Sequence, residues 1–447
     1  MRSIDGEVVQ RKRCPSYNLS VSLRLDSSPG RGAFGIEERE VSKFMDSEKV
    51  IKRDNDYVLH TYNRNPIALE KGHGLYAEGP EGQKYLDFTS GIGVNSLGYC
   101  DVDWAEAVSE QAHKLQHTSN LYYTAPCGKL AKKLCKRTGM SKVFFGNSGA
   151  EANEGAIKAA RKYSVDHYGK DRTTVITLVN SFHGRTIATL TATGQEVFHN
   201  YFGPFNEGFL YAPAGDIEAL KDLIDRHTCA VMLELIQGEG GVLPLDPEFV
   251  KGVEAFCKEE DLLLIVDEVQ TGIGRTGAWF AFQREDLSGG VTPDIVTFAK
   301  GVGGGFPMGG MISFGAELSA LFTPGSHGST FAGNPLGASA ALATLGVIEE
   351  DNLVDNAEER GKQLRDGIAS CGNPLFVSVR GRGLLDAIEL AHPCSHAAMN
   401  WALEHGLIVN AVAPNALRLA PPLVITAQDV DQAVSILAKI PSDLPND

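Results

Sequence analysis

The sequence predicts an α/β protein with a mostly parallel central sheet and a smaller α+β domain that is built from both chain ends. From about residue 140, short apolar runs alternate with stretches of helical periodicity, which is typical of a parallel sheet covered by helices on both faces. Strand-like runs precede this region and hairpin-like runs follow it, so we expect the two ends to combine. The length of 447 residues is consistent with two or three domains.

Strands are expected where short apolar runs are bounded by turn residues, and helices where apolar residues recur at helical spacing. Residues 67–88 contain the first short strands, with a turn at 79–82. Helices are expected at 150–168 and 247–260, Ala-rich helices follow from about residue 336, and hairpin-like material occupies 406–425. The central strands are expected at 143–146, 175–179, 230–235, 262–267, 295–300 and 311–314.

The chain is expected to divide into four parts. Residues 1–44 mix Ser, Gly and Arg with little periodicity, and Met45 directly precedes the first coherent pattern, so we expect a disordered or mis-assigned N-terminal extension. Residues 45–104 and 346–447 would form the two parts of the small domain. Residues 105–345 would form the large domain, which would bind a cofactor.

Composition and charge exclude several classes of function. The 41 Lys+Arg and 56 Asp+Glu give a net charge of −15, and no basic run exceeds residues 11–13, so no nucleic-acid or membrane partner is expected. No stretch approaches the roughly 18 apolar residues of a membrane-spanning helix. The eight cysteines form no C-x-x-C pair and none lies at zinc spacing beside a histidine, so we expect no metal site and a cytoplasmic enzyme with reduced thiols.

Three groups are predicted to meet at the carboxyl edge of the sheet, where ligands bind in folds of this class. Asp267 ends a buried apolar run, where an unpaired charge is costly, and therefore needs a cationic partner. Lys300 ends the run 295–300, and a desolvated lysine becomes a nucleophile. The segment 146–153 places small residues and Ser148 at a helix start, as a phosphate cradle does. Together they suit pyridoxal phosphate, whose aldehyde, ring nitrogen and phosphate need a lysine, an anion and a cradle.

Other interpretations of the same residues stay open. Charges solvated at the ends of strands would explain Asp267 and Lys300, and an ordinary helix N-cap would explain Ser148. Ser148, Asp267 and His327 occur in the order of a hydrolase triad, so a serine hydrolase is a remote alternative, although it gives Lys300 no role. The Gly-x-Gly-x-x-Gly pattern at 272–277 is weak evidence for a dinucleotide site, because it does not lie in the turn that follows the strand.

Ten motifs occur in a fixed order from residue 62 to the end. The clearest are Asn-Ser-Gly-Ala-Glu-Ala-Asn at 147–153, Asp-Glu-Val-Gln-Thr-Gly at 267–272 and Ala-Lys-Gly at 299–301. Others lie at 62–67, 85–95, 119–124, 182–185, 236–242, 327–330 and 418–423. In these stretches the chain resembles the class III (omega) aminotransferases, most closely the acetylornithine aminotransferases. The resemblance implies a fold type I, pyridoxal-phosphate-dependent transferase and a homodimer with shared active sites.

The resemblance implies a role for each residue around the cofactor. Lys300 would hold the cofactor covalently and then carry a proton between the substrate carbon and the cofactor. Asp267 would keep the ring nitrogen protonated, and Gln270 would lie near the phenolic oxygen. Phe182 and Val269 would cover the two faces of the ring. The implied cofactor-binding residues are Ser148, Gly149, Ala150, Phe182, His183, Asp267, Val269, Gln270, Lys300 and Thr330, the last from the opposite subunit.

The resemblance also implies how the substrates are held. Arg185 looks like the family's carboxylate anchor, since a planar guanidinium binds a carboxylate through two hydrogen bonds. Glu239 and Arg418 look like the family's switch pair: paired, Arg418 is neutralised while the donor binds, and released, it holds the second carboxylate of 2-oxoglutarate. The implied substrate-binding residues are Tyr62, Ile92, Arg185, Glu239, Ser329 and Arg418.

The expected reaction moves the delta-amino group of N2-acetylornithine to 2-oxoglutarate, giving N-acetylglutamate 5-semialdehyde and glutamate, as in arginine biosynthesis. Ile92 stands where the ornithine aminotransferases carry a tyrosine that helps to hold a free alpha-amine, which favours an acylated donor. The alternative donors are 4-aminobutyrate, ornithine, succinylornithine and N-succinyl-diaminopimelate. Two stretches, 98–103 and Glu234-Leu235, depart from the family's usual Gly-His-x-His-Pro and Glu-Pro.

Overall fold

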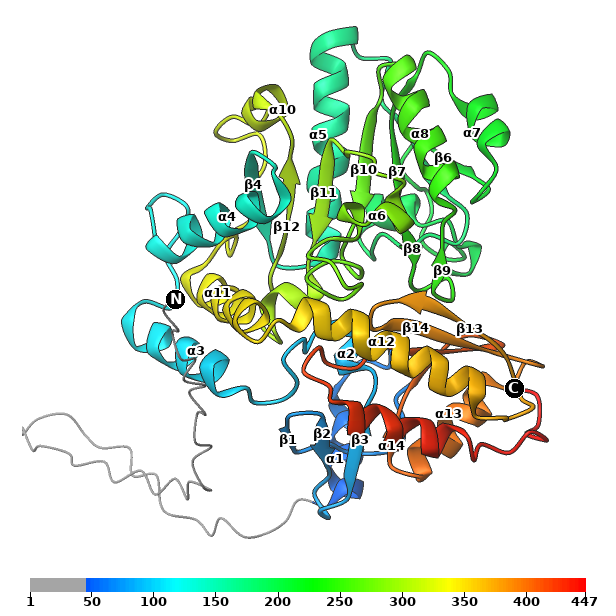
Figure 1. The fold of residues 1–447 in the computed structure, drawn as a ribbon. Coiled ribbons are helices and arrows are strands. Elements are labelled where there is room, and N and C mark those ends of the chain that lie inside the picture. Colours follow the sequence, from blue (N-terminus) through cyan, green and yellow to red (C-terminus); the bar gives the residue numbers. More distant parts are fainter. Residues whose placement is uncertain (1–45) are drawn as a thin grey trace, which may run out of the picture. The chain divides into compact units, whose positions relative to one another are not determined.

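The computed structural model describes residues 46–447, so the extension predicted at 1–44 lies outside the described residues. A seven-stranded sheet in the order β4-β12-β11-β10-β7-β5-β6 lies at its centre (Figure 1). Neighbouring strands are parallel except at β12, which is antiparallel to both β11 and β4. The strands are β4 (Lys142–Gly146), β5 (Thr174–Leu178), β6 (Phe209–Ala212), β7 (Thr228–Leu233), β10 (Leu263–Asp267), β11 (Ile295–Phe298) and β12 (Gly309–Ser313).

The α/β prediction with a mostly parallel sheet is confirmed, with two differences in detail. Strand β6 was not predicted, although Phe209–Ala212 is an apolar run between Gly208 and Pro213; it lies at the edge of the sheet, where Leu210 and Tyr211 are each 36% exposed. Strand β11 ends at Phe298, so Lys300 does not end the strand as predicted but begins a 3₁₀ turn, η3 (Lys300–Gly303). Lys300 has φ of 42°, in the left-handed region that non-glycine residues seldom adopt.

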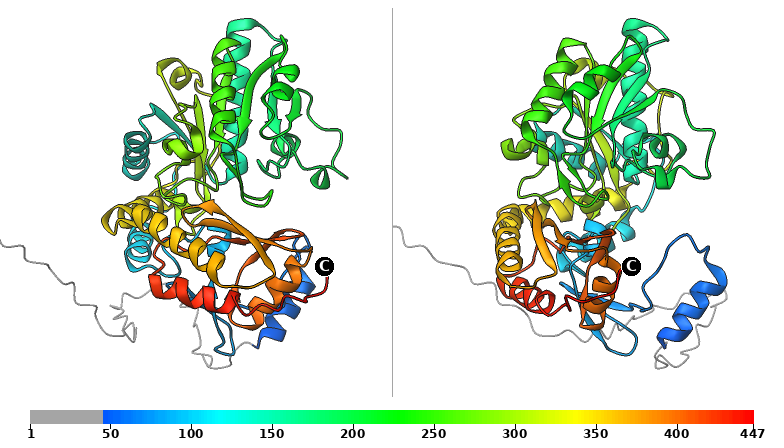
Figure 2. Two further views of the ribbon diagram at one scale, coloured as in Figure 1. Left: turned by 45° about the vertical axis from the view of Figure 1, so that its right-hand side comes forward. Right: turned by 90° about the vertical axis from the view of Figure 1, so that its right-hand side faces the viewer.

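Alternate side chains of the central strands pack against helices on opposite faces of the sheet. Met232 and Ile265 belong to one buried cluster together with Ala160 of α5 (Gly149–Tyr168). Val231, their neighbour on the other face, belongs to a second cluster with Val253 of α8 (Pro247–Glu259). The right-hand view of Figure 2 shows α5 and α8 on either side of the sheet. Because both faces are covered, polar groups that end the strands meet at one edge.

Segments from both ends of the described chain share a smaller four-stranded sheet, β1-β2-β3-β15. Leu86 of β3 pairs in parallel with Leu407 of β15. A third sheet, β13-β14-β17-β16, carries Arg418 on β17. The strands are β1 (Lys71–His73), β2 (Tyr76–Glu78), β3 (Lys84–Asp87), β13 (Phe376–Arg382), β14 (Leu385–Leu390), β15 (Leu407–Ile408), β16 (Asn410–Ala413) and β17 (Ala416–Leu419), and β8 (Ile236–Gln237) pairs with β9 (Leu243–Pro244). Since residues 45–447 form one compact unit, the boundaries at 104/105 and 345/346 stay a prediction.

Helices complete the fold around the sheets. The Ala-rich helices predicted from residue 336 are α11 (Pro335–Glu350) and α12 (Leu353–Ser370). Among residues 46–447, no helix combines the length and the apolar character that crossing a bilayer requires. The other α-helices are α1 (Ser47–Tyr57), α2 (Ser90–Gly93), α3 (Val102–Lys114), α4 (Ala125–Thr138), α6 (Ile187–Ala192), α7 (Ile217–Leu223), α9 (Glu285–Ser288), α10 (Ala316–Ala320), α13 (Ser395–Glu404) and α14 (Ala427–Leu437).

The unusual stretch 98–103 is accommodated by local contacts. The Tyr99 hydroxyl donates to Asp87 Oδ2 at 2.8 Å, and its ring lies against Gly72, where a Cβ would come within 2.5 Å of it. Asp101 accepts from Trp104 N at 2.9 Å and so caps the start of α3. These contacts give the departure a structural role, and none of the three residues Tyr99, Cys100 and Asp101 lines the cavity described next.

Candidate active site

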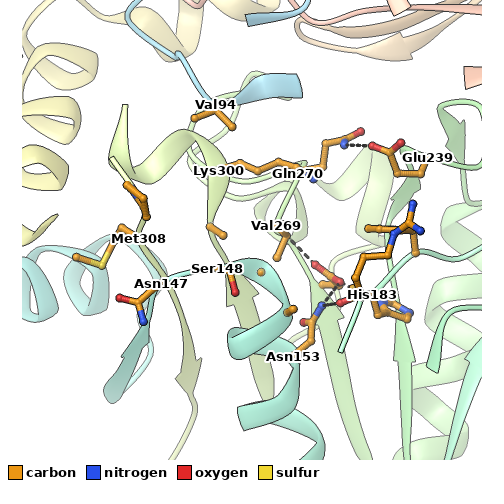
Figure 3. Close-up of a pocket in the computed structure, with 18 of the residues that line it drawn as sticks. Val94, Asn147, Ser148, Asn153, His183, Glu239, Val269, Gln270, Lys300 and Met308 are labelled. Carbon is orange, nitrogen blue, oxygen red and sulfur yellow. Dashed lines mark hydrogen bonds and ion pairs between the residues drawn. The ribbon is translucent and has the colours of Figure 1, made fainter. Parts of the chain in front are cut away.

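A cavity of about 420 Å³ opens where the carboxyl ends of the parallel strands meet (Figure 3). Its lining includes Asn147 just after β4, Phe182 and His183 beyond β5, Glu234 just after β7, and Asp267 at the end of β10. Lys300 enters it from the turn that follows β11. The sheet therefore brings together groups that lie far apart in sequence, as the strand-end argument predicted.

Asp267 is buried at the end of β10 and its carboxylate accepts four hydrogen bonds. Asn153 Nδ2 donates to Oδ2 at 2.7 Å, and His183 Nδ1 lies 2.8 Å from the same oxygen. The Val269 N–H donates to Oδ1 at 2.9 Å, and the Thr297 hydroxyl lies 3.3 Å from it. These contacts fix the carboxylate in one orientation, so it can face a cationic ring atom of a ligand in the cavity.

Lys300 is a half-buried lysine that extends into the same cavity. Burial lowers the pKa of its amine from the ordinary value, although the nearby carboxylates of Glu239 and Asp267 partly oppose this. An amine with a lowered pKa is more often unprotonated near neutral pH, which suits a nucleophile or a proton carrier. The left-handed backbone at Lys300 is a departure of the kind found at functional sites.

The turn between β4 and α5 has the form predicted for a phosphate cradle. Ser148 caps α5 by accepting from Glu151 N, and Ser148, Gly149 and Ala150 all line the cavity. A Cβ at Gly149 would come within 2.7 Å of Val269 Cγ1, so only a glycine lets this turn pack directly against Val269. The N-terminus of this 20-residue helix therefore presents free N–H groups to an anion.

The hydrolase arrangement is not formed. Asp267 pairs with His183, whereas His327 Nδ1 lies 3.0 Å from Lys158 Nζ. The His327 ring packs against Phe144 and does not line the cavity that holds Ser148. A serine nucleophile at 148 would therefore lack its base, and the serine hydrolase alternative is not supported.

Arg185 and Phe182 line one wall of the cavity together. The Arg185 guanidinium lies over the rings of Phe182 and Phe198, with its Cζ atom 5.4 Å and 4.1 Å from the ring centroids. Among the ion pairs found within residues 46–447, none involves Arg185. The guanidinium is thus positioned by stacking and available to a carboxylate of a ligand.

Glu239 and Arg418 form an ion pair beside Lys300. Arg418 Nη1 lies 2.6 Å from Glu239 Oε1, and Glu239 lines the cavity while Arg418 is buried behind it. Burial acts to raise the pKa of Glu239, but the charges of Arg418 and Lys300 and the hydrogen bonds from Arg418 and Gln270 hold it below the ordinary value. The carboxylate therefore stays ionised and neutralises Arg418 in this arrangement.

Five residues predicted to contact cofactor or substrate do not line the cavity in this chain: Tyr62, Ile92, Ser329, Thr330 and Arg418, the last of which is buried behind Glu239. Tyr62 is 75% exposed and Thr330 is also exposed. Ile92 is 41% exposed, two residues before Val94, which does line the cavity. The Ser329 hydroxyl donates to Glu151 and accepts from Asn147 Nδ2, each at 3.0 Å, so it braces the cradle turn. Their predicted roles stay predictions.

Sequence reasoning missed three polar residues of the cavity, Glu234, Asn147 and Asn153. Glu234 follows β7 directly, so the strand-end argument that identified Asp267 also applied to it. Its Oε2 atom accepts from Phe182 N at 2.9 Å, and burial followed by the charge of Asp267 raises the pKa of Glu234 well above the ordinary value. Asn153 lies one turn into α5, within the motif 147–153, where its contact with Asp267 was not visible.

The chain matches known aminotransferases over most of its length. The family described as aminotransferase class-III matches residues 57–440. The chain belongs to the class III aminotransferases. An acetylornithine aminotransferase of Bifidobacterium longum is 58% identical over 398 residues, which cover 85% of this chain and 92% of that protein.

Solved class III aminotransferases share the fold. The ornithine aminotransferase from Toxoplasma gondii ME49 has a TM-score of 0.83 at 32% identity and covers 89% of this chain and 95% of that one. The acetylornithine aminotransferase from Elizabethkingia anophelis has a TM-score of 0.78 at 34% identity, with 88% and 98% covered. The expected fold type I and the resemblance to class III aminotransferases are confirmed.

Class III aminotransferases depend on pyridoxal phosphate, and the cavity contains the groups that this cofactor needs. Asp267 supplies a fixed carboxylate for the ring nitrogen, and Lys300 supplies an amine for the aldehyde. The turn at 146–150 would offer backbone donors to the phosphate, and Gly149 in this turn packs against Val269, which also lines the cavity. The residues present therefore fit the cofactor.

Proposed function

We propose that this class III aminotransferase moves the delta-amino group of N2-acetylornithine to 2-oxoglutarate, giving N-acetylglutamate 5-semialdehyde and glutamate. One observation carries the proposal: a cation without an ion-pair partner among the described residues, Arg185, lines the cavity, and a second cation, Arg418, lies buried behind Glu239, which masks it. N2-acetylornithine carries one carboxylate and 2-oxoglutarate carries two, so the two substrates need one and two cations, respectively. The name of the 58% identical relative also favours this donor.

Each residue has a task that follows from its position. Arg185 binds the carboxylate that both substrates carry away from the reacting carbon. Arg418 binds the carboxylate next to the keto group of 2-oxoglutarate, which displaces Glu239. Bound pyridoxal phosphate supplies the electron sink for the reaction, while Lys300 carries the proton at the substrate carbon and Asp267 holds the ring nitrogen charged.

The apolar residues near the cavity mouth favour an acylated donor. Val94 lines the cavity and Ile92 lies two residues before it, and neither side chain provides a hydrogen-bond partner for a free alpha-amine. Leaving an ammonium group without a partner beside apolar side chains is costly, whereas an acetamide is neutral. Ornithine is therefore expected to be a poorer donor than N2-acetylornithine.

A single-turnover screen tests the choice of donor. Holoenzyme is mixed with N2-acetylornithine, succinylornithine, N-succinyl-diaminopimelate, ornithine or 4-aminobutyrate, and the spectral change of the cofactor is followed. We expect N2-acetylornithine to react fastest and ornithine and 4-aminobutyrate about 100-fold more slowly, since each lacks or mismatches polar contacts. A faster reaction with 4-aminobutyrate would refute the donor but not the class of enzyme.

Arg185→Leu is expected to weaken the binding of both substrates. The variant removes the guanidinium that binds the carboxylate common to donor and acceptor, so kcat/KM should fall by about 100-fold or more in each half-reaction. Arg185→Lys keeps a charge but not the planar pair of donors, and we expect it to restore only part of the loss. Steady-state kinetics with each substrate varied would measure this. An unchanged KM for both substrates would contradict the role.

A homodimer with shared active sites is part of the proposal. Thr330, which the family places at the cofactor phosphate of the opposite subunit, is exposed in the single chain. Exposed apolar side chains occur near it in sequence and in the motif at 119–124, and clusters of this kind mark interaction surfaces. They are Leu121, Tyr122, Tyr123 and Phe331.

We place the reaction in the cytoplasm, where the free thiols of the seven described cysteines would stay reduced.

A further inference from the structure

A third residue, Gln270, contacts both members of the Glu239–Arg418 pair. Gln270 Nε2 donates to Glu239 Oε1 at 3.1 Å, the contact drawn as a dashed line in Figure 3. Its Oε1 atom accepts from Arg418 Nη1 at 3.3 Å. The side chain amide thus donates to the anion and accepts from the cation at the same time, which no carboxylate, ammonium or guanidinium group can do.

The backbone around Gln270 holds this amide in place. A Cβ at Gly238 would come within 1.8 Å of Gln270 Oε1, so the amide lies directly on the Gly238 backbone. Gln270 itself is 9% exposed and follows Asp267 in the turn after β10, where the Val269 N–H is bonded to Asp267. Its position therefore does not depend on its contact with Glu239.

Arg418 needs such a neighbour when Glu239 moves away. Its guanidinium is 2% exposed, and its Nε atom has no partner among the residues that the structure describes. Without Glu239, the partners left to Nη1 are the Gly238 carbonyl at 3.4 Å and Gln270 Oε1. A buried charge that loses its partner is strongly unfavourable, so any polar contact that remains lowers the cost of releasing Glu239.

We propose that Gln270 is a positioning residue for the exchange of carboxylates at Arg418. It keeps Arg418 in place while Glu239 is replaced by the second carboxylate of a dicarboxylic acceptor. Its Nε2 donor then serves the incoming carboxylate as it served Glu239. The inference rests on the proposed function, since it assumes that the acceptor carries a second carboxylate to Arg418.

Gln270→Glu tests the inference by placing a permanent carboxylate next to Arg418. Arg418 would then stay neutralised after Glu239 leaves, so kcat/KM for 2-oxoglutarate should fall at least about 100-fold. The donor half-reaction needs no free Arg418, so its loss should be at least about tenfold smaller. A change in how Gln270 contacts the cofactor lowers the rates of both half-reactions alike. Dividing the loss in the acceptor half-reaction by the loss in the donor half-reaction therefore cancels this common effect.

Gln270→Met serves as the second variant, because it keeps the approximate volume and removes both hydrogen bonds. We expect this variant to lower kcat/KM of the acceptor half-reaction about tenfold more than kcat/KM of the donor half-reaction. Equilibrium binding of glutarate and of butyrate to the holoenzyme gives a readout without turnover. Both variants should lower the affinity for glutarate, which has two carboxylates, more than the affinity for butyrate, which has one.

Gln363→Met is the matched control, because Gln363 lies outside the cavity and its amide bonds to Ala427 and Asp431 of α14, and it should change neither ratio. Equal losses in both half-reactions for Gln270→Glu and Gln270→Met, with unchanged glutarate-to-butyrate selectivity, would overturn the inference. Arg418→Met separates this from a failure of the proposed function. If that variant also leaves the acceptor-to-donor ratio unchanged, the acceptor does not use Arg418 and the proposed function fails.

Discussion

Lys300→Ala is expected to abolish turnover with every amino donor. The variant removes an amine whose pKa is lowered by burial and which lies in the same cavity as Asp267. Among the described residues lining the cavity it is the only lysine, so no neighbouring amine can take its place. Loss of the nucleophile and of the proton carrier together should reduce the rate by at least about 10⁵-fold. Glutamate production by purified enzyme with saturating cofactor measures it.

The control for this variant is Lys362→Ala. Lys362 lies on the exposed surface of α12 in an ion pair with Asp366, so its removal should leave turnover and cofactor content unchanged. Mass spectrometry after borohydride reduction would show the cofactor attached in the parent enzyme and not in Lys300→Ala. Turnover by Lys300→Ala above about one hundredth of the parent rate would disprove the assigned role.

Asp267→Asn should lower kcat by about 1,000-fold, the second largest effect. The substitution keeps the shape but replaces the charge that faces the ring nitrogen with a neutral amide, which weakens the electron sink. A rate loss of this size corresponds to about 4 kcal/mol of transition-state stabilisation. The amide oxygen can replace only one of the two carboxylate oxygens, so either the contacts of Asn153 and His183 with Oδ2 or those of Val269 and Thr297 with Oδ1 are lost.

Two comparisons make the Asp267→Asn result interpretable. Thr297→Val removes one of the weaker hydrogen bonds to the carboxylate, at 3.3 Å, and should cost less than about tenfold in kcat. Asp366→Asn on the surface of α12 should have no effect. Rates are measured at saturating cofactor so that weaker cofactor binding does not lower kcat. If Asp267→Asn is no slower than Thr297→Val, the carboxylate is not required at the ring.

The sequence predicted site residues correctly where they directly follow a buried strand, because the strand alone then determines where they lie. Asp267 and the cradle at 146–153 were predicted because a buried apolar run must end at the edge of a parallel sheet. The same argument would have found Glu234, whose direct attachment to β7 is equally visible. Lys300 was placed in the correct cavity but on the wrong element, because the chain turns two residues earlier than its apolar character indicates.

Contacts between distant segments could not be predicted from local patterns. The meeting of Gln270 with both Glu239 and Arg418 depends on how β17 lies beside the turn after β10, and no periodicity specifies that distance. The edge strand β6 was missed although Phe209–Ala212 is an apolar run bounded by turn residues, the same signal that identified the central strands. The identification of Glu239 and Arg418 came from family resemblance alone, whereas their 2.6 Å ion pair is seen only in the structure.

The pairing of β3 with β15 sets the order in which this protein can be assembled during synthesis. Leu86 leaves the ribosome long before Leu407, so β3 has an unpaired edge while the whole central sheet is being made. The central strands, in contrast, are complete once β12 has emerged, before any of β13 to β17 has been made. Strand β3 therefore pairs with β2 early but gains its second neighbour only near the end of synthesis, and until then its free edge can pair with other chains.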